Sequence, residues 1–435
     1  MPNIHRPLSA VERWYWICDQ FSTLNVISRV RVYGELCYET LRYALDELQA
    51  RHPLLRAKVE HDKGLNPRWL PIHQPIPLRK VYCERDDQWI HEINERELLE
   101  RIDPDTGPLI RVVVISDPNG IHDLLVTVAH TIADGTTVLS LAEQWLTLAS
   151  GSTTIKGTNR VLASVEELRP PQFIGDEGDK RLAEQNAGDT ELIAQCKPGR
   201  VKPSVMIPFE LRQSQLLHRE LNEDELDAVI QVSRRHKTTV HGALTAALVL
   251  AVAHDANFQS NYFAVGSPVN FRGELLPPVR SDEVGSYVAT VLSIVDYSLP
   301  FWDIARSITT DLSERRLHGH HFNLLTMIVA NAPQSIADAR AFMEFMEAEG
   351  PINLVSSNLG LFPFPNQIGE WKLSDAQFLS GISVNGYFVA TINSSHKRLF
   401  WNFTYIKNLI PENRAEFLAD NCLRFLRTAI GKLTN

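Results

Sequence analysis

A histidine and an aspartate lie four residues apart in the segment VTVAHTIADGTTVLSL, residues 126–141. An apolar run ends at Ala129, His130 follows directly, and Asp134 and Gly135 precede a helical pattern. A histidine that follows a strand and precedes a Gly-bearing turn lies outside the core, where its ring can face a cleft. Neutral imidazole suits general-base catalysis because its unperturbed pKa lies near the operating pH. His130 is therefore the candidate base, and Asp134 is expected to fix its loop by pairing with the backbone or with a remote arginine.

The spacing of this pair is weak support when taken alone. A chain with 15 histidines and 52 acidic residues contains about one His-x-x-x-Asp pair by chance. A loop histidine beside a helix-capping aspartate explains the same spacing without any chemistry. The elements around the pair must therefore separate the two interpretations.

The predicted elements follow the same order in both halves of the chain. The first half has predicted helices at 9–21, 38–51 and 136–149 and predicted strands at 26–33, 109–116 and 122–129. Ser9 and Glu12 have the spacing of a capping box at the first helix, and Pro53 ends the second. The second half has the strand-like LHRELNE, helices at 223–236 and VHGALTAALVLAVAH, strands at 382–392 and 398–406, and a helix at 411–427. The order strand, turn, strand, helix therefore occurs twice, which predicts two similar α/β halves.

The segment from about residue 150 to residue 205 differs in composition from both halves. GSTTIKGTN, RPP, GDEGDK and KPGRVKP are rich in Gly, Pro, Ser and charge, which is typical of a linker or long crossover with short helices. The predicted fold is α/β, an α+β sandwich of two domains. The expected division is a first domain at 1–175, a linker at 176–205 and a second domain at 206–435.

Composition narrows the class of protein. The chain has 435 residues, 44% hydrophobic and 22% charged, the balance of a soluble globular protein. Its net charge of −9 argues against nucleic acid as the main partner. Five widely spaced cysteines predict neither a disulfide framework nor a zinc site. The chain lacks a signal-peptide core and any run of about eighteen apolar residues, so we expect a cytoplasmic protein without a membrane span.

Other motifs carry less weight. The histidines of HGHH, His318, His320 and His321, lack a carboxylate or cysteine at ligand spacing, so we expect a solvated segment and no metal site. The aromatic run Trp14, Tyr15 and Trp16 lies on a predicted helix and is interpreted as core. The chain contains no Walker loop, GxGxxG or GxSxG, which removes the usual signatures of phosphoryl transfer, Rossmann redox and serine-hydrolase chemistry.

Several segments resemble one superfamily. VAHTIADG resembles the HHxxxDG signature of chloramphenicol-acetyltransferase-like proteins, which include peptide-synthetase condensation domains, plant BAHD acyltransferases and polyketide-associated acyltransferases. RPLSAVERWYW, LDELQARHPLLRAKVE, SPVNFRGELLPPVRSDEVGSYVATV and INLVSSNLGLF resemble, in the right order, segments of the polyketide-associated group, typified by phthiocerol dimycocerosyl transferase. The likeness covers nearly the whole chain. Ala129 stands where many members have the first histidine, and the second, which is the catalytic one in the family, is His130.

The resemblance implies two domains of similar fold with an active-site tunnel between them. By that resemblance His130 deprotonates an acceptor, which attacks a donor thioester in a ternary complex without an acyl-enzyme. The donor would be acyl-CoA or a phosphopantetheinyl carrier, with no permanently bound cofactor. Asp134 would have a structural role and pair with Arg272 of VNFRG, with Arg280 as the competing partner.

The tetrahedral intermediate of such a reaction carries an oxyanion that needs hydrogen-bond donors. Ser356, Ser357 and Asn358 in LVSSNLG lie in a segment that matches the family and are the candidate donors, although a Ser/Asn-rich turn explains them equally well. The backbone N–H of Gly135 is a further candidate. Its lack of a side chain would leave room for a pantetheine arm passing His130.

Three functions follow from these patterns. The first is an O-acyltransferase that moves an acyl group from a thioester to a hydroxylated small molecule of secondary or lipid metabolism. The second is amide formation, as in condensation domains, because nothing in His130 distinguishes an alcohol from an amine. The third is a catalytically silent scaffold that binds an acyl carrier protein, which the missing first histidine keeps open.

Overall fold

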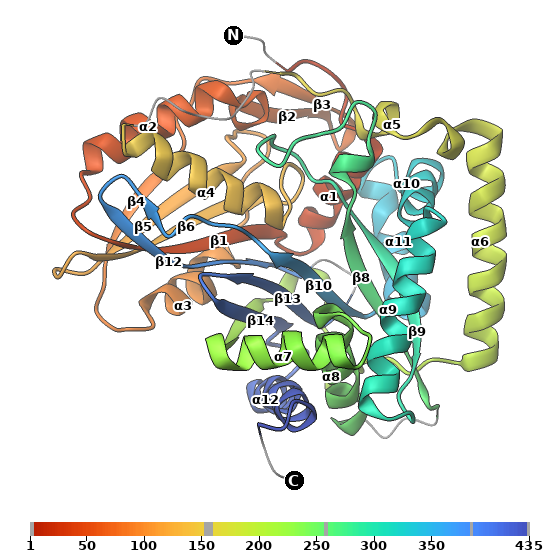
Figure 1. Cartoon of the computed structure of the whole chain (residues 1–435). Coiled ribbons are helices and arrows are strands. Elements are labelled where there is room, and N and C mark those ends of the chain that lie inside the picture. Colours follow the sequence, from red (N-terminus) through yellow and green to blue (C-terminus); the bar gives the residue numbers. More distant parts are fainter. Residues whose placement is uncertain (1–3, 152–159, 256–259, 383–385, 433–435) are drawn as a thin grey trace.

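The computed structural model describes residues 4–151, 160–255, 260–382 and 386–432. Its strands form two six-stranded mixed sheets and a separate two-stranded hairpin. Figure 1 shows strands of the two large sheets meeting in the middle of the molecule, with α2 and α4 above them and α7, α8 and α12 below. The predicted two-lobed α/β fold is confirmed.

The first lobe is built on the sheet with the strand order β11-β12-β1-β6-β5-β4. Its strands are β1 (Asn25–Tyr33), β4 (Leu78–Tyr82), β5 (Ile110–Ser116), β6 (Ile121–Ala129), β11 (Gln367–Ile368) and β12 (Trp371–Ser380), and β2 (Ala57–Asp62) and β3 (Leu65–Pro71) form the hairpin. Its helices are α1 (Ala10–Phe21), α2 (Tyr38–Arg51), α3 (Gln88–Glu92) and α4 (Gly135–Ala149). Helix α4 is buried almost throughout because α2 covers one side and the sheet covers the other. It therefore holds its first turn, next to the candidate base, in a rigid core.

The second lobe is built on the sheet with the order β7-β14-β13-β10-β8-β9. Its strands are β7 (Ser214–Leu221), β8 (Tyr262–Asn270), β9 (Val288–Asp296), β10 (Leu354–Leu361), β13 (Phe388–Ser395) and β14 (Arg398–Ile406). Its helices are α7 (Glu223–Arg235), α8 (Val240–Asp255), α9 (Phe301–Leu317), α10 (His320–Asn331) and α12 (Glu412–Ala429). Helix α11 (Ile336–Glu349) follows α10 in the chain, but its buried residues pack in the core of the first lobe. Helix α8 lies between α9, α12 and the sheet, which explains why its sequence has no polar face. In the described part of the chain no helix combines the length and the apolar run that a membrane span needs.

The two lobes repeat one arrangement of elements. In the first lobe the antiparallel hairpin β5–β6 leads to α4, and β1 pairs antiparallel with β6 along its whole length. In the second lobe the antiparallel hairpin β13–β14 leads to α12, and β7 pairs antiparallel with β14. The predicted repeat is therefore present. The strand expected at 382–392 begins at Phe388, and residues 383–385 lie outside the described residues.

Two strands of the first sheet come from the second half of the sequence. Strand β12 pairs antiparallel with β1, from Val26 opposite Ser380 to Tyr33 opposite Lys372. The predicted boundary at residue 206 therefore does not separate the two sheets, because β11 and β12 follow it in the sequence but belong to the first sheet.

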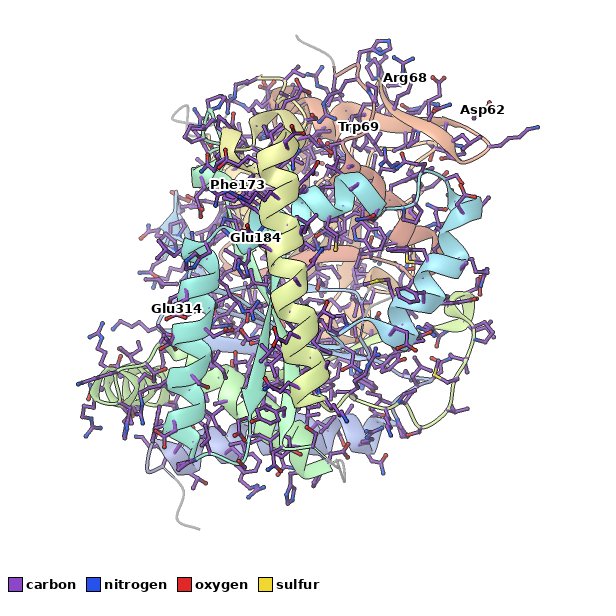
Figure 2. The ribbon with its side chains drawn as sticks, turned by 90° about the vertical axis from the view of Figure 1, so that its right-hand side faces the viewer. Asp62, Arg68, Trp69, Phe173, Glu184 and Glu314 are labelled. Atoms are coloured by element: carbon purple, nitrogen blue, oxygen red, sulfur yellow. The ribbon has the colours of Figure 1, made fainter. Side chains whose placement is uncertain are left out.

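The segment expected to be a linker contains a long helix. Helix α6 (Gly175–Cys196) follows the short α5 (Val165–Leu168), and Gly178 is its one buried residue. Figure 2 shows α6, marked by the label Glu184, running alongside α9, marked by the label Glu314. The segment was expected to contain only short helices, and this is wrong because α6 has 22 residues. A helix that buries almost nothing has no apolar stripe, so its sequence does not show the periodicity on which helix prediction depends.

Candidate active site

His130 lies directly after β6. Strand β6 pairs with β1 as far as Ala129, which lies opposite Asn25. The backbone N–H of His130 donates to the carbonyl of Leu24 at 3.0 Å, and the N–H of Ile132 donates to the carbonyl of Ala129 at 3.0 Å. The strand therefore ends in a tight turn that brings the histidine out of the sheet, where its side chain is half-buried.

Two side chains hold the imidazole ring of His130. The ring of Tyr15, on α1, stacks on it with the ring centroids 4.1 Å apart and the planes 10° apart. The Oγ of Ser286 lies 3.4 Å from Nδ1. No side chain among the described residues hydrogen-bonds the other nitrogen, Nε2. The interpretation of Tyr15 as a core residue was therefore incomplete, because a contact across this sequence distance leaves no local signal.

The environment of His130 favours the neutral imidazole. Burial lowers its pKa, and the nearby backbone carbonyls and the charge of Asp134 oppose this lowering without overcoming it. Because the side-chain contact with Ser286 lies at Nδ1, Nε2 is the candidate basic nitrogen.

The carboxylate of Asp134 has a structural position. It is 2% exposed and caps α4 by accepting the N–H of Thr137 at 3.0 Å. It also accepts the N–H of Tyr287 at 2.9 Å and pairs with Arg272 at 2.8 Å. Asp134 therefore joins the loop that carries His130 to two segments of the second lobe.

Arg272, rather than Arg280, is the partner of Asp134. The guanidinium of Arg272 is buried and also donates to the carbonyl of Gly285 at 2.9 Å. Gly285 forms a parallel β-bridge with Ala133, so backbone and side chains connect the same two loops. Arg280 instead pairs with Asp282 at 2.8 Å near the surface. The competing assignment is therefore wrong.

Gly135 is the first residue of α4, and neighbouring side chains pack closely against its backbone where a Cβ atom would be. A Cβ atom there would lie 2.6 Å from Cδ2 of Phe378 and 3.0 Å from Cδ1 of Leu359. The space expected to admit a pantetheine arm is therefore filled by protein atoms. The glycine instead lets β10 and β12 approach the turn that holds His130.

Replacing Gly135 with Ala is expected to destabilise the protein by about 1–3 kcal/mol, because the added methyl group overpacks a rigid core. Urea unfolding measures this change. Gly188→Ala on α6, where a Cβ meets no atom within 4 Å, is the matched control and should stabilise slightly. Equal urea midpoints for the two variants would show that Phe378 moves to accommodate the added methyl group without loss of stability.

The three candidate oxyanion donors on β10 face different surroundings. Ser356 is buried, and its Oγ hydrogen-bonds Thr245 of α8 at 2.9 Å, on the helix-covered face of the second sheet. Asn358 accepts a backbone N–H two residues further along the strand. Ser357 is half-buried and faces away from Thr245, because successive strand residues point to opposite faces. Leu359 contacts the start of α4. The contacts therefore occupy the hydroxyl of Ser356 and the amide oxygen of Asn358, and the oxyanion roles of Ser356, Ser357 and Asn358 stay predictions.

The HGHH segment does not have uniform surroundings. His318 is exposed, whereas His321 is buried and its Nε2 lies 2.9 Å from Oε2 of Glu274. The expectation of a solvated segment is therefore wrong for His321. Among the described residues, no group of three or more His, Cys, Asp or Glu side chains is placed to hold a metal ion.

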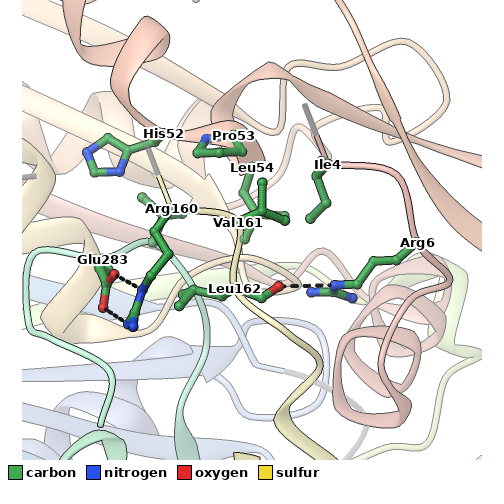
Figure 3. Close-up of a pocket in the computed structure, with 10 residues that line it drawn as sticks. Ile4, Arg6, His52, Pro53, Leu54, Arg160, Val161, Leu162 and Glu283 are labelled. Carbon is green, nitrogen blue, oxygen red and sulfur yellow. Dashed lines mark hydrogen bonds and ion pairs between the residues drawn. The ribbon is translucent and has the colours of Figure 1, made fainter. Parts of the chain in front are cut away.

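A small cavity is lined by residues from the N-terminal segment, the segment around Leu162 and the loop before Gly285. Figure 3 shows it beside the ion pair of Arg160 with Glu283, which spans 2.7 Å, and beside Arg6, which donates to the carbonyl of Leu162. Its volume is about 20 Å³, enough for about one water molecule. That volume is too small for a pantetheine arm, and the tunnel implied by the resemblance stays a prediction.

The fold and two family matches define the class of this protein. Residues 5–153 match the Condensation domain family, and residues 212–366 match the family described as Phthiocerol/phthiodiolone dimycocerosyl transferase C-terminus. Solved structures with the same two-lobed fold cover nearly the whole chain. The first third of the chain therefore matches condensation domains, part of the second half matches a phthiocerol/phthiodiolone dimycocerosyl transferase family, and the fold is that of condensation domains and chloramphenicol-acetyltransferase-like acyltransferases.

Individual relatives within this superfamily catalyse different reactions. The trichothecene 15-O-acetyltransferase of Fusarium sporotrichioides superposes with a TM-score of 0.75 at 13% identity and covers 99% of this chain and 100% of that one. The epimerization domain of tyrocidine synthetase B gives 0.72 at 14% identity and covers 99% and 97%. Polyketide synthase associated protein 5 of Mycobacterium tuberculosis gives 0.66 at 16% identity and covers 99% of both chains. At these identities the likeness shows the fold and does not choose a reaction.

Curated relatives match parts of the chain. Tyrocidine synthase 3 of Brevibacillus parabrevis is 28% identical over 152 residues, which is 33% of this chain and 2% of that protein. The probable non-canonical nonribosomal peptide synthetase CymA of Salinispora arenicola is 25% identical over 312 residues, 67% of this chain and 4% of that protein. This chain therefore spans only a few per cent of the length of these relatives.

Proposed function

We propose that this protein is an acyltransferase that moves an acyl group from a thioester to a hydroxyl acceptor, with His130 as general base. The donor is acyl-CoA or an acyl group on the phosphopantetheine of a carrier protein. Nε2 of His130 accepts the hydroxyl proton as the acceptor oxygen attacks the thioester carbonyl. The tetrahedral intermediate then collapses with cleavage of the C–S bond, and the departing thiolate takes the proton from Nε2 and leaves as the free thiol. One observation carries the proposal: the half-buried, neutral imidazole of His130 on a loop that the buried Asp134–Arg272 pair joins to the second lobe.

Amide formation is the second candidate. The curated relatives are peptide synthetases, and the first third of the chain matches the condensation domain family. A neutral base at Nε2 serves an amine acceptor as well as an alcohol. The match of residues 212–366 to an acyltransferase family makes the alcohol the first acceptor to test.

Purified protein incubated with a panel of acyl-CoA and acyl-carrier donors, each with alcohol and amine acceptors, tests both candidates. Mass spectrometry separates ester from amide products, and free thiol release reports turnover. Ester products support the proposal, and amide products support the second candidate. Tight carrier binding without product on any acceptor would instead favour the non-catalytic scaffold.

The rate is expected to stay constant with pH further into the acid range than an ordinary histidine would allow. A general base must be deprotonated, and burial lowers the pKa of His130 below its usual 6.5. We therefore expect kcat/KM to be flat from pH 8 down through pH 6.5 and to fall about tenfold per pH unit below the lowered pKa. Initial rates in buffers of constant ionic strength measure this profile. An acid limb centred above pH 6.5 would contradict it.

A further inference from the structure

We infer that Tyr15 is a positioning residue, which fixes the imidazole of His130 through a face-to-face stack and a hydrogen-bonded Ser286. This inference rests on the proposed function, because it concerns how the base is held. The stack is close and nearly parallel, with 4.1 Å between ring centroids and 10° between planes. Offset stacks of this kind contribute energy beyond apolar burial and limit ring rotation.

Tyr15 lies where two apolar clusters meet. It packs both against the core of the first lobe and against a smaller cluster that contains Phe271 and Tyr287 of the second lobe. Its own helix is fixed at the N-terminus, where the carboxylate of Glu12 accepts the backbone N–H of Ser9 at 2.6 Å. The ring of Tyr15 therefore has a rigid support on both sides of the junction.

The hydroxyl of Tyr15 extends this support to Nδ1 of His130. Burial raises the pKa of Tyr15, and a hydrogen bond with Ser286 partly offsets that rise. The same Ser286 hydroxyl lies 3.4 Å from Nδ1 of His130. The phenol is therefore neutral at pH 7 and does not act as a base. The Tyr15–Ser286 pair instead sets the plane of the imidazole and engages Nδ1, so the inference places the ring proton on Nδ1 and the basic nitrogen at Nε2.

Nuclear magnetic resonance of the protein with isotope-labelled histidine tests this arrangement without any substrate. Signals of His130 are assigned by their loss in His130→Ala. In the wild type at pH 8 we expect ring protons shifted upfield by the Tyr15 ring current and a single tautomer with its proton on Nδ1. In Tyr15→Leu the upfield shift should disappear and the two tautomers should mix. A wild-type protein without the upfield shift would overturn the inference, even if Tyr15→Leu failed to fold.

Kinetics provide the second readout. For Tyr15→Leu we expect kcat to fall by about 10–100-fold with KM changed less than about threefold, because a misplaced base affects the transition state more than binding. Tyr15→Phe keeps the stack and should lose about two- to fivefold. Trp14→Leu is the matched control. Trp14 lies on the same helix as Tyr15, but its ring packs against Phe342 of α11 with the ring centroids 5.7 Å apart, so this change should leave kcat within about twofold.

The two proposals fail in different ways. If the wild type transfers no acyl group to any acceptor, the proposed function fails, while the resonance data still decide whether Tyr15 orients His130. If the wild type is active and a folded Tyr15→Leu variant keeps both its kcat and its single tautomer, the positioning role is wrong and the acyl transfer stands.

Discussion

Replacing His130 with Ala is expected to reduce acyl transfer by about 10²–10⁴-fold, the usual contribution of a general base. The acceptor hydroxyl then loses the group that takes its proton, while the binding surfaces for donor and acceptor remain. The effect should appear in kcat more than in KM, because the proton is transferred in the transition state. Initial rates with the best donor and acceptor from the panel measure it.

A matched histidine variant separates this loss from a general disturbance. His73 is exposed and far from β6 in the sequence, so His73→Ala should keep the wild-type rate. The circular dichroism and urea midpoint of His130→Ala should stay near those of the wild type, since the removed ring is half-buried and contributes little to the core. A His130→Ala variant that retains a tenth or more of the wild-type kcat would exclude His130 as the base.

Replacing Asp134 with Asn is expected to destabilise the protein by about 3–5 kcal/mol, because it leaves the buried cation of Arg272 without its counterion. The two groups are 2% and 3% exposed, so water cannot take over the lost interaction. The amide can still accept the N–H of Thr137 and cap α4, so the loss reflects the missing charge. Activity should fall with stability, since the same carboxylate fixes the loop of His130.

A second ion pair in the same region provides the control. Arg280→Ala removes a surface pair with Asp282 and should change the free energy of unfolding by less than about 1 kcal/mol. In the double variant Asp134→Asn with Arg272→Met, part of the loss should be recovered, because no unpaired charge remains buried. Urea unfolding of the wild type, Arg280→Ala, the two single variants Asp134→Asn and Arg272→Met and their double variant measures both effects. Additive losses in the double variant would show that Asp134 and Arg272 act independently.

Patterns with a local cause were predicted well from the sequence. The capping box of Ser9 and Glu12, the β5–β6 hairpin and the buried helix α8 all depend on periodicity and on residues a few positions apart. Helix α6 was expected only as short pieces, because a helix that packs loosely on a neighbouring lobe has no apolar stripe to reveal it. The membership of β12 in the first sheet was also missed, since strand pairing across the chain depends on the whole fold.

In the candidate site, too, features that depend on neighbouring residues were predicted, and contacts between distant segments were not. The order strand, turn and helix around His130, and the capping position of Asp134, follow from the types and spacing of neighbouring residues. The resemblance to known acyltransferases chose Arg272 over Arg280, and the ion pair supports that choice. Neither spacing nor resemblance indicated Tyr15 or Ser286, and Gly135 was expected to leave space that Phe378 fills.

The sequence by itself determined the two α/β halves, the strand-end position of His130 and the acidic cap that follows it, because each of these depends on interactions between near neighbours in the chain. The tertiary structure decided which arginine neutralises Asp134, which ring stacks on the imidazole and which ring nitrogen Ser286 contacts. Those features arise where α1, β6 and the loop before β9 come together, and burial there changes the energies of charges and ring contacts in ways that no local pattern records.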